Sequence, residues 1–306
     1  MTWRVGIDLG GTNCRGALVD TTGLVSSILC RPTPATADRS YLVAFLGDFI
    51  HELIASSETE ISSIGLGVPG VISADGVVTV SPNLPQLNGF SLRSHLAKSF
   101  SLPVYVANDA NAQAWGEAVC GAGRCFDSFA VITLGTGVGG GLVLHRQLWT
   151  GHDGAAGEIG HIMVEEDGLP CGCGAKGCLE QYASATALRR RAQALLATGK
   201  KSLLPAGDFS CATLFSVARQ GDLLASQVVE EGGRRLGQVI AGLANLLNLD
   251  AILLCGGVAQ GFDLLLPGIK REIVARCFDI PQRRLQILPG RLRDEAGILG
   301  SALLAH

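Results

Sequence analysis

The sequence lacks an excess of charge of either sign. Its 24 lysines and arginines nearly balance 27 aspartates and glutamates, which leaves a formal net charge of -3. A general nucleic-acid-binding surface needs a basic stripe, and attachment to an anionic membrane needs a basic cluster. The near balance therefore argues against nucleic acid and membranes as partners.

Long hydrophobic runs are also missing. The most apolar stretch, residues 129–144, contains five glycines and two threonines. It is also shorter than the roughly 18 residues that a membrane span needs. Two strands joined by a glycine loop over 135–141 explain this stretch better. The first predicted strand begins at Trp3, which leaves no space for a signal peptide, so we expect a soluble cytoplasmic protein.

No low-complexity segment or linker interrupts the 306 residues, which are enough for two domains. Hydrophobic patterns predict helices over 41–54, from about 110 and over 228–247. They predict strands over 3–9, 14–19, 64–68, 103–107, 129–134, 142–144 and 251–255. Alternating strands and helices indicate an α/β protein.

A weak internal repeat divides the chain into halves. Strand 3–9 is followed by Gly10-Gly11-Thr12, and strand 129–134 by Gly135-Thr136-Gly137, each before a second strand. The repeat predicts two similar lobes that face each other across a central cleft. We place the smaller lobe at residues 1–112, with the C-terminal helix 295–306 packing on it, and the larger lobe at 113–294.

Three glycine turns follow predicted strands: Gly10-Gly11-Thr12, Gly135-Thr136-Gly137 and Gly256-Gly257. Glycine lets backbone N–H groups approach phosphate oxygens closely, and a threonine hydroxyl adds a donor. The Walker motif is absent, and no turn has the Rossmann spacing. A single such turn is more often a plain hairpin, but two in matching positions of a repeat favour phosphate binding.

Two carboxylates stand at strand ends. Asp8 precedes the first glycine turn, where it could hold Mg²⁺ against nucleotide phosphates or simply cap the turn. Asn108 and Asp109 follow strand 103–107 and precede a helix, where either could be an N-cap. The functional alternative is a general base that accepts the proton of an attacking hydroxyl.

Seven of the ten cysteines are scattered, and we expect them to be small buried hydrophobic residues: Cys14, Cys30, Cys120, Cys125, Cys211, Cys255 and Cys277. The other three, Cys171, Cys173 and Cys178, lie close behind His161 and complete a Cys₃His set typical of zinc. All four positions are filled by protein, so we predict a structural zinc ion without a catalytic water.

Zinc on one nitrogen of His161 would orient the ring and leave the other nitrogen to donate a hydrogen bond. Glu158 and Glu180 flank the metal set and can be held on the same side. Two carboxylates and one imidazole suit sugar hydroxyls; the alternative for the glutamates is solvated surface charge.

With these motifs, the sequence resembles the ROK family of sugar kinases and related repressors, in particular its glucokinase-like branch. The resemblance runs from Asp8 to the terminal helix and is most specific over residues 157–180. It implies an actin-like ATPase (ribonuclease H-like) fold, ATP with Mg²⁺ as co-substrate, and a homodimer.

The resemblance also implies roles for individual residues. Asp109 would be the catalytic base, and the sugar would be bound by Gly70, Asn83, Asn108, Asp109, Glu158, His161 and Glu180. Gly10, Gly11, Thr12, Gly135, Thr136 and Gly137 would hold the ATP phosphates, and Gly256 and Gly257 the adenosine. Zinc would be held by His161, Cys171, Cys173 and Cys178.

Glucose, phosphorylated at its 6-hydroxyl, is the first choice of substrate because residues 155–161 are similar to glucokinases. The ten-residue step from His161 to Cys171 also fits N-acetylmannosamine kinases, whereas fructose kinases tend to carry a longer insertion. Residues 81–85 resemble allose kinases equally well. The competing functions are a repressor, for which no helix-turn-helix domain fits ahead of Asp8, and a sugar sensor without kinase activity.

Overall fold

The computed structural model describes residues 2–304, and its first sheet has five strands in the order β3-β2-β1-β4-β8. Their bounds are Leu29–Pro32 for β3, Asn13–Asp20 for β2, Trp3–Leu9 for β1, Ile61–Val68 for β4 and Val104–Asn108 for β8. β2 pairs with β1 and β3 in antiparallel fashion, and β4 pairs with β1 and β8 in parallel. These strands confirm those predicted over 3–9, 14–19, 64–68 and 103–107.

Two helices pack on one face of this sheet. α1 (Arg39–Ala55) begins at the N-cap Asp38, whose side chain accepts a hydrogen bond from the Tyr41 N–H. α2 (Leu92–Phe100) begins at the N-cap Ser91. The helix predicted over 41–54 forms one core with the sheet through Leu42, Leu46, Phe49, Ile50 and Leu53, whereas Tyr41 is exposed.

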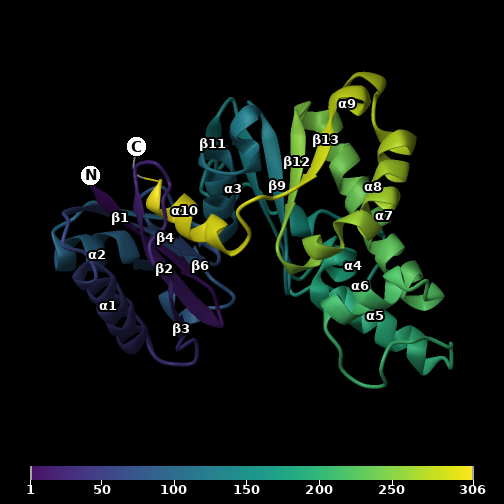
Figure 1. The fold of residues 1–306 in the computed structure, drawn as a ribbon, viewed down its shortest axis with the longest axis horizontal. Helices are drawn as coiled ribbons and strands as arrows, with labels where there is room; N and C mark the ends of the chain where they lie inside the picture. The colour runs from purple at the N-terminus through teal and green to yellow at the C-terminus, as the bar shows by residue number, and fades with distance from the viewer. Residues whose placement is uncertain (1, 305–306) are drawn as a thin grey trace. The chain divides into compact units, whose positions relative to one another are not determined.

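Two other helices, α3 (Asp109–Val119) and α10 (Ala296–Ala302), pack against each other and against β4. Figure 1 shows α10 beside β2 and β4. The helix backbone lies directly on the sheet, because a Cβ on Gly65 would lie 1.8 Å from the Ser301 carbonyl oxygen. Only glycine permits this approach. Residues 305 and 306 of the predicted terminal helix lie outside the described residues.

A buried carboxylate joins α3 to the C-terminal segment. Glu117 is fully buried, and its two oxygens accept hydrogen bonds from the backbone N–H groups of Ala122, Arg291 and Leu292 at 2.7–2.9 Å. Burial of a charged group is tolerated when its hydrogen-bonding capacity is used. Glu117 therefore fixes the point at which the chain returns to this part of the fold.

The second sheet repeats the order of the first, as β11-β10-β9-β12-β13. Its strands are Gln147–Trp149, Val138–Leu144, Phe129–Leu134, Ala251–Cys255 and Gln286–Pro289, in that order. β12 pairs in parallel with β9 and β13, as β4 does with β1 and β8. The predicted loop over 135–141 was too long, since Gly135 N donates to Gly137 O at 3.0 Å and the next strand already begins at Val138.

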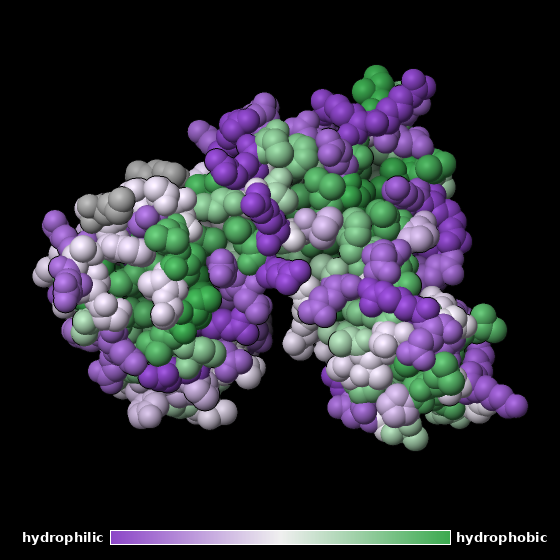
Figure 2. Space-filling view, viewed as in Figure 1, coloured by the Kyte–Doolittle hydropathy of each residue, from purple (hydrophilic) through white to green (hydrophobic). Residues whose placement is uncertain are grey.

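Six helices lie between β11 and the last described helix, α10: α4 (Glu180–Ala183), α5 (Ala185–Ala197), α6 (Cys211–Arg219), α7 (Leu223–Leu247), α8 (Phe262–Arg276) and α9 (Asp279–Arg284). α7 and α8 pack closely, because Gly233 brings α7 against the Leu265 carbonyl. Figure 2 shows hydrophilic residues around the α8–α9 end with a hydrophobic group at its tip. Two apolar side chains there, Phe278 and Ile280, are 69% and 66% exposed.

Short elements complete the described chain. A three-stranded sheet is formed by β5 (Val71–Ile72), β6 (Val77–Val80) and β7 (Phe90–Ser91). Five 3₁₀ helices are η1 (Pro85–Leu87), η2 (Ala122–Cys125), η3 (Ile159–His161), η4 (Gly257–Gly261) and η5 (Arg293–Glu295). None of the helices in residues 2–304 combines the length and the hydropathy that crossing a bilayer requires.

The scattered cysteines behave only in part as expected. Cys14 and Cys255 are buried in strands, and Cys120, Cys211 and Cys277 are intermediate. The prediction was wrong for Cys30 and Cys125, which are exposed. Cys30 lies on the edge strand β3 and Cys125 ends the surface helix η2, so neither position faces a core.

The chain divides into two compact units. The first takes in residues 1–127, 141–157 and 291–306, and the second takes in 128–140 and 158–290. The boundary that we predicted after residue 112 falls inside helix α3, and the helix α10 belongs to the first unit. The chain does not divide within α3, because this helix packs along its length on α10 and β4.

Candidate functional site

The first glycine turn is held by a neighbouring threonine and lies beside Asn83. Gly10 N donates to Asn13 O at 2.9 Å, which closes the turn between β1 and β2. Thr33 donates its hydroxyl to Gly10 O at 2.8 Å and its backbone N–H to Thr12 O at 2.9 Å. A Cβ on Gly11 would lie 3.3 Å from the Asn83 Cβ. The structure therefore brings Asn83, predicted to contact the sugar, next to the predicted phosphate turn.

Asp8 is half-buried and ends β1 just before this turn. It lies opposite Arg15 in the register of β1 and β2, and a Cβ on Gly297 would come within 2.9 Å of its carboxyl carbon. The pKa of Asp8 is raised to about 6, first by burial and then by the nearby Asp109 carboxylate, while Arg15 opposes the rise. A carboxylate that is costly to ionise in isolation is suited to hold a cation.

Asn108 and Asp109 stand at the junction of β8 and α3. Asn108 is the N-cap, with Oδ1 accepting from Asn111 N at 3.0 Å, while its Nδ2 donates to Gly70 O at 3.0 Å. Asp109 Oδ1 accepts from Ala110 N at 2.8 Å. The capping interpretation is thus correct for Asn108. Asp109 is consequently the first residue of α3.

The backbone at position 70 requires glycine. Its φ is +110°, and a Cβ there would lie 2.1 Å from the Val80 carbonyl oxygen. The peptide at this turn presents the carbonyl that receives the Asn108 amide. Two predicted sugar-binding positions are therefore joined by a direct hydrogen bond in the first unit.

The second glycine turn is held from the segment that follows the cysteines. Glu180 Oε2 accepts from Val138 N at 3.0 Å, and a Cβ on Gly137 would lie 2.4 Å from the same oxygen. Ala185 N donates to Gly135 O at 2.8 Å, and Thr186 Oγ1 donates to Thr136 O at 2.9 Å. Sequence reasoning placed Glu180 only with the sugar, whereas the structure also places it on the turn predicted to bind phosphate.

The predicted metal ligands come together. The ligand atoms of His161, Cys171, Cys173 and Cys178 all lie within 4.8 Å of one another. Cys171 Sγ lies 3.6 Å from His161 Nδ1, and Cys173 Sγ lies 3.6 Å from Cys178 Sγ. Tetrahedral zinc with Zn–S of about 2.3 Å and Zn–N of about 2.1 Å requires edges of about 3.6–3.8 Å. The four residues therefore fit a tetrahedral metal ion.

Nδ1 of His161 faces the sulfurs and Nε2 faces the other way. Nε2 lies 3.8 Å from Glu158 Oε2. One ring nitrogen is thus directed to the cysteines and the other toward a carboxylate, as expected for a histidine oriented by a metal. Glu158 and His161 form a polar pair in the second unit.

The third glycine turn lies at the end of β12. Gly256 has φ +86°, and a Cβ there would lie 2.5 Å from the Leu134 carbonyl oxygen. Gly257 begins η4, which leads into α8. The backbone at this turn approaches the end of β9, directly before the second glycine turn.

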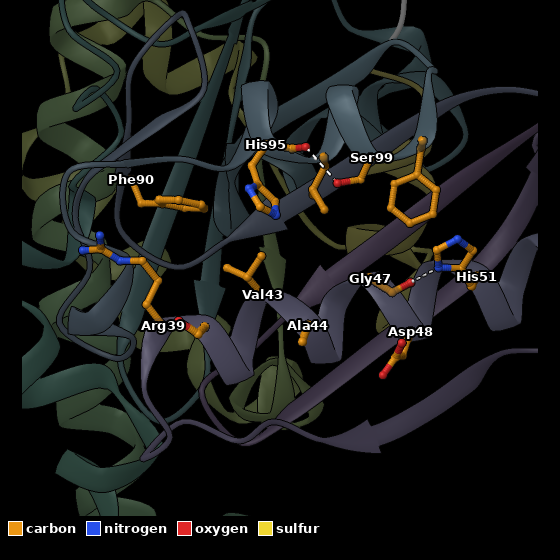
Figure 3. A pocket seen from close by; sticks show the side chains of 12 residues that line it. Arg39, Val43, Ala44, Gly47, Asp48, His51, Phe90, His95 and Ser99 are labelled. Atoms are coloured by element: carbon orange, nitrogen blue, oxygen red, sulfur yellow. Dashed lines mark hydrogen bonds between the residues drawn. The ribbon is translucent and has the colours of Figure 1, made fainter.

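A cavity of about 460 Å³ lies between α1 and α2. Figure 3 shows Arg39, His51, Phe90 and His95 among its lining residues. None of the residues predicted to bind sugar, ATP or metal lines it.

Sequence reasoning missed three groups that act on the predicted site. Arg15 is 3.2 Å from Asp294 and opposes the raised pKa of Asp8. Strand alternation could have found Arg15, since a short hairpin turn places it opposite Asp8. Thr33 and Thr186 each donate a hydroxyl hydrogen bond to a carbonyl of a glycine turn, and no local sequence pattern identifies them.

Two features now define the class of protein: paired sheets of matching strand order, each with a glycine turn between adjacent strands, and a Cys₃His cluster. This is the actin-like ATPase fold of sugar kinases. The ROK family model matches residues 4–306. The chain belongs to the ROK family.

Similar proteins include both enzymes and a regulator. A glucokinase of Thermotoga maritima is 35% identical over 97% of this chain and 95% of its own. The structure of a ROK family glucokinase from Streptomyces griseus, in complex with glucose and AMPPNP, is 34% identical with a TM-score of 0.83 and 99% coverage of both chains. A ROK family transcriptional regulator, described as a homologue of the E. coli MLC protein, is 30% identical with a TM-score of 0.92. The match covers 98% of this chain and 77% of the regulator.

Proposed function

We propose that this protein is an ATP-dependent hexose kinase of the glucokinase type, which phosphorylates the 6-hydroxyl of glucose. The observation that carries the proposal is the pair of carboxylates Asp8 and Asp109, close enough to raise the pKa of Asp8, in the unit that holds the first glycine turn. Similarity to glucokinases, including one solved with glucose and AMPPNP, supports glucose as the sugar.

Asp109 would act as general base. The sugar hydroxyl donates its proton to the Asp109 carboxylate while its oxygen bonds to the γ-phosphorus, and the bond from that phosphorus to the ADP oxygen breaks. Asp8 would hold Mg²⁺ near the phosphates, directly or through water. Its raised pKa supports this role, because a nearby cation favours the ionised form that burial disfavours.

The other roles follow the predicted groups. Gly70, Asn83 and Asn108 of the first unit and Glu158, His161 and Glu180 of the second would contact the sugar. The turns at residues 10–12 and 135–137 would bind phosphates through backbone N–H groups, and Gly256-Gly257 would lie against the adenosine. The hydrogen bond between Asn108 and Gly70 supports their common role.

Zinc would be held by His161, Cys171, Cys173 and Cys178, and when bound it supplies structural stability rather than reactivity. His161 Nδ1 faces the cysteines while Nε2 faces Glu158, so the ring can both bind the metal and donate to a polar partner. Elemental analysis of purified protein tests this, with about one zinc per chain expected.

A coupled ADP-release assay over a panel of hexoses tests the function. Glucose should give the highest kcat/KM, with N-acetylmannosamine, allose and fructose as the alternatives of the same family. Size-exclusion chromatography with light scattering tests the proposed homodimer, which rests on the resemblance alone. Localisation in the cytoplasm also remains a proposal.

A second function, sugar sensing without phosphotransfer, is favoured by one observation: the TM-score of 0.92 to a regulator of the family. Binding of glucose without ADP release over the whole sugar panel would support it. Retention of both carboxylates, Asp8 and Asp109, favours the kinase.

A further inference from the structure

The segment just after the last cysteine of the Cys₃His cluster holds the second glycine turn at three points. Its contacts are Glu180 Oε2 with Val138 N at 3.0 Å, Ala185 N with Gly135 O at 2.8 Å, and Thr186 Oγ1 with Thr136 O at 2.9 Å. Within the turn itself, Gly135 N donates a hydrogen bond to Gly137 O. Residues 180–186 thus determine where the turn lies.

Two of these contacts come from the first turn of α5, which is itself well anchored. Its N-cap Ser184 is buried and accepts from Ala187 N, and the helix packs on α7. The third contact, from Glu180, differs because it uses a charged side chain. A hydrogen bond from a backbone N–H to a carboxylate is roughly twice as strong as a neutral one.

The carboxylate of Glu180 also lies against the turn itself. A Cβ on Gly137 would approach Oε2 to 2.4 Å, so glycine is required at that position for the contact. A carboxylate accepts hydrogen bonds at both oxygens. Holding Val138 N with Oε2 therefore leaves Oε1 for a donor such as a sugar hydroxyl.

We propose that Glu180 is a positioning residue for the nucleotide as well as a sugar-binding residue. Its Oε2 fixes the turn at residues 135–137 for phosphate, and its Oε1 accepts from the sugar, so one side chain couples the two substrates. This inference rests on the proposed function. The coupling is reciprocal, because a sugar that strengthens nucleotide binding must be bound more tightly when nucleotide is present.

The test compares Glu180→Ala, Glu180→Gln and Thr186→Val with the unmodified protein. AMPPNP affinity is measured by isothermal titration calorimetry with and without glucose, and glucose affinity with and without AMPPNP. Glu180→Ala removes both contacts, so nucleotide affinity should fall about tenfold even without sugar, the typical cost of a charge-assisted hydrogen bond. It should also abolish the effect of glucose on AMPPNP binding.

The two other variants separate the contacts. Glu180→Gln keeps an acceptor for Val138 N, so nucleotide affinity should return to within about threefold of the unmodified protein while glucose binding stays weakened. Thr186→Val touches only the turn, so it should raise the KM for ATP and leave the KM for glucose unchanged. Zinc content and melting temperature are measured for each variant.

Unchanged AMPPNP affinity and unchanged coupling in folded, zinc-loaded Glu180→Ala would overturn the proposal. Loss of zinc in that variant would also count against the proposal, because the weaker AMPPNP binding would then result from the lost metal and not from the lost Glu180 contact. If Glu180→Ala does not fold, a failure of Glu180→Gln to separate the two affinities overturns it. An unmodified protein that phosphorylates no hexose contradicts the proposed function instead, and AMPPNP titrations without sugar still report on the turn.

Discussion

The two glycine turns occupy the same place in their sheets but have different chemistry around them. Each joins adjacent strands of a sheet with the same strand order, and each has a carbonyl that accepts a threonine hydroxyl, from Thr33 in one case and Thr186 in the other. The carboxylates differ. Asp8 is half-buried just before the first turn and has a raised pKa, whereas Glu180 accepts a backbone N–H of the second turn directly.

This difference shows what duplication of a fold preserves. The repeat keeps the strand order and the place of the glycine turn, and the side chains beside the two turns differ. A half-buried carboxylate with a raised pKa is suited to a cation, and a carboxylate on a backbone N–H is suited to hold a loop. Four variants should sharpen the contrast, from the largest expected effect to the smallest.

Asp109→Asn should have the largest effect, and it acts beside the first turn. The amide keeps the shape and an acceptor for Ala110 N but cannot accept the hydroxyl proton. We expect kcat to fall about 10²–10⁴-fold, the usual contribution of a general base, with glucose affinity nearly unchanged. Steady-state kinetics and glucose titration measure both, and activity above about a tenth of normal would contradict the role of Asp109.

Cys178→Ser tests the support of the second turn. We expect loss of the metal and of most glucose affinity, because His161 and Glu180 both depend on the loop, and a lower melting temperature, because structural zinc contributes to folding. Nucleotide binding should weaken too, since Glu180 holds Val138. Elemental analysis is read beside separate glucose and AMPPNP titrations, with Cys125→Ser as the control cysteine outside the cluster. Zinc-free, folded protein with normal glucose affinity would show that the metal does not orient the site.

Asp8→Asn should lower the activity with ATP but raise the stability of the fold. We expect kcat/KM for ATP to fall about 10–100-fold, as for other groups that support a metal, with glucose affinity spared. A change in glucose affinity alone would show that Asp8 acts on the sugar rather than on Mg²⁺ and ATP, and it would contradict the proposed role.

The same variant should be more stable than the unmodified protein at neutral pH. The folded pKa of Asp8 is raised from 3.8 to about 6, so above pH 6 the ionised group carries its full burial cost. As the pH falls through 6 the folded state binds a proton first, and below 3.8 both states are protonated and the cost is gone. The two-unit shift corresponds to at most about 3 kcal/mol. Urea unfolding at pH 7.5, 5 and 4 should show the advantage of Asp8→Asn shrinking as the pH falls, and a constant difference would contradict the raised pKa.

How much of this could be predicted from the sequence differs between backbone and side chains. Apolar runs that end in glycine placed the strands at 3–9 and 129–134, because burial on both faces leaves a nearly continuous apolar pattern. The Cys₃His cluster was equally local, with all four ligands within eighteen residues. The start of β10 was missed, because a glycine run contains no side-chain pattern to distinguish strand from loop.

Contacts between segments that are distant in the sequence produce no local sequence pattern. Thr186 reaches Thr136 across fifty positions, and Glu117 reaches Arg291 across 174. Their side chains are ordinary for a helix, and only the fold gives them partners. The dual contact of Glu180 was hidden for the same reason: its place after Cys178 indicated the metal loop, not the glycine turn.

Thr33→Val should have the smallest effect and offers the closest comparison between the turns. Valine keeps the shape of threonine, retains the backbone bond from residue 33 to Thr12 O, and removes only the hydroxyl bond to Gly10 O. A neutral hydrogen bond contributes about 1 kcal/mol, so the free energy of unfolding should fall by about that amount. Thr186→Val removes the equivalent bond in the second turn, where Glu180 and Ala185 remain as supports. Hydrogen exchange at residues 10–13 and 135–138 should therefore rise in the affected turn only, and more for Thr33→Val. Equal protection in both variants would mean that the strands, rather than these threonines, hold the two turns.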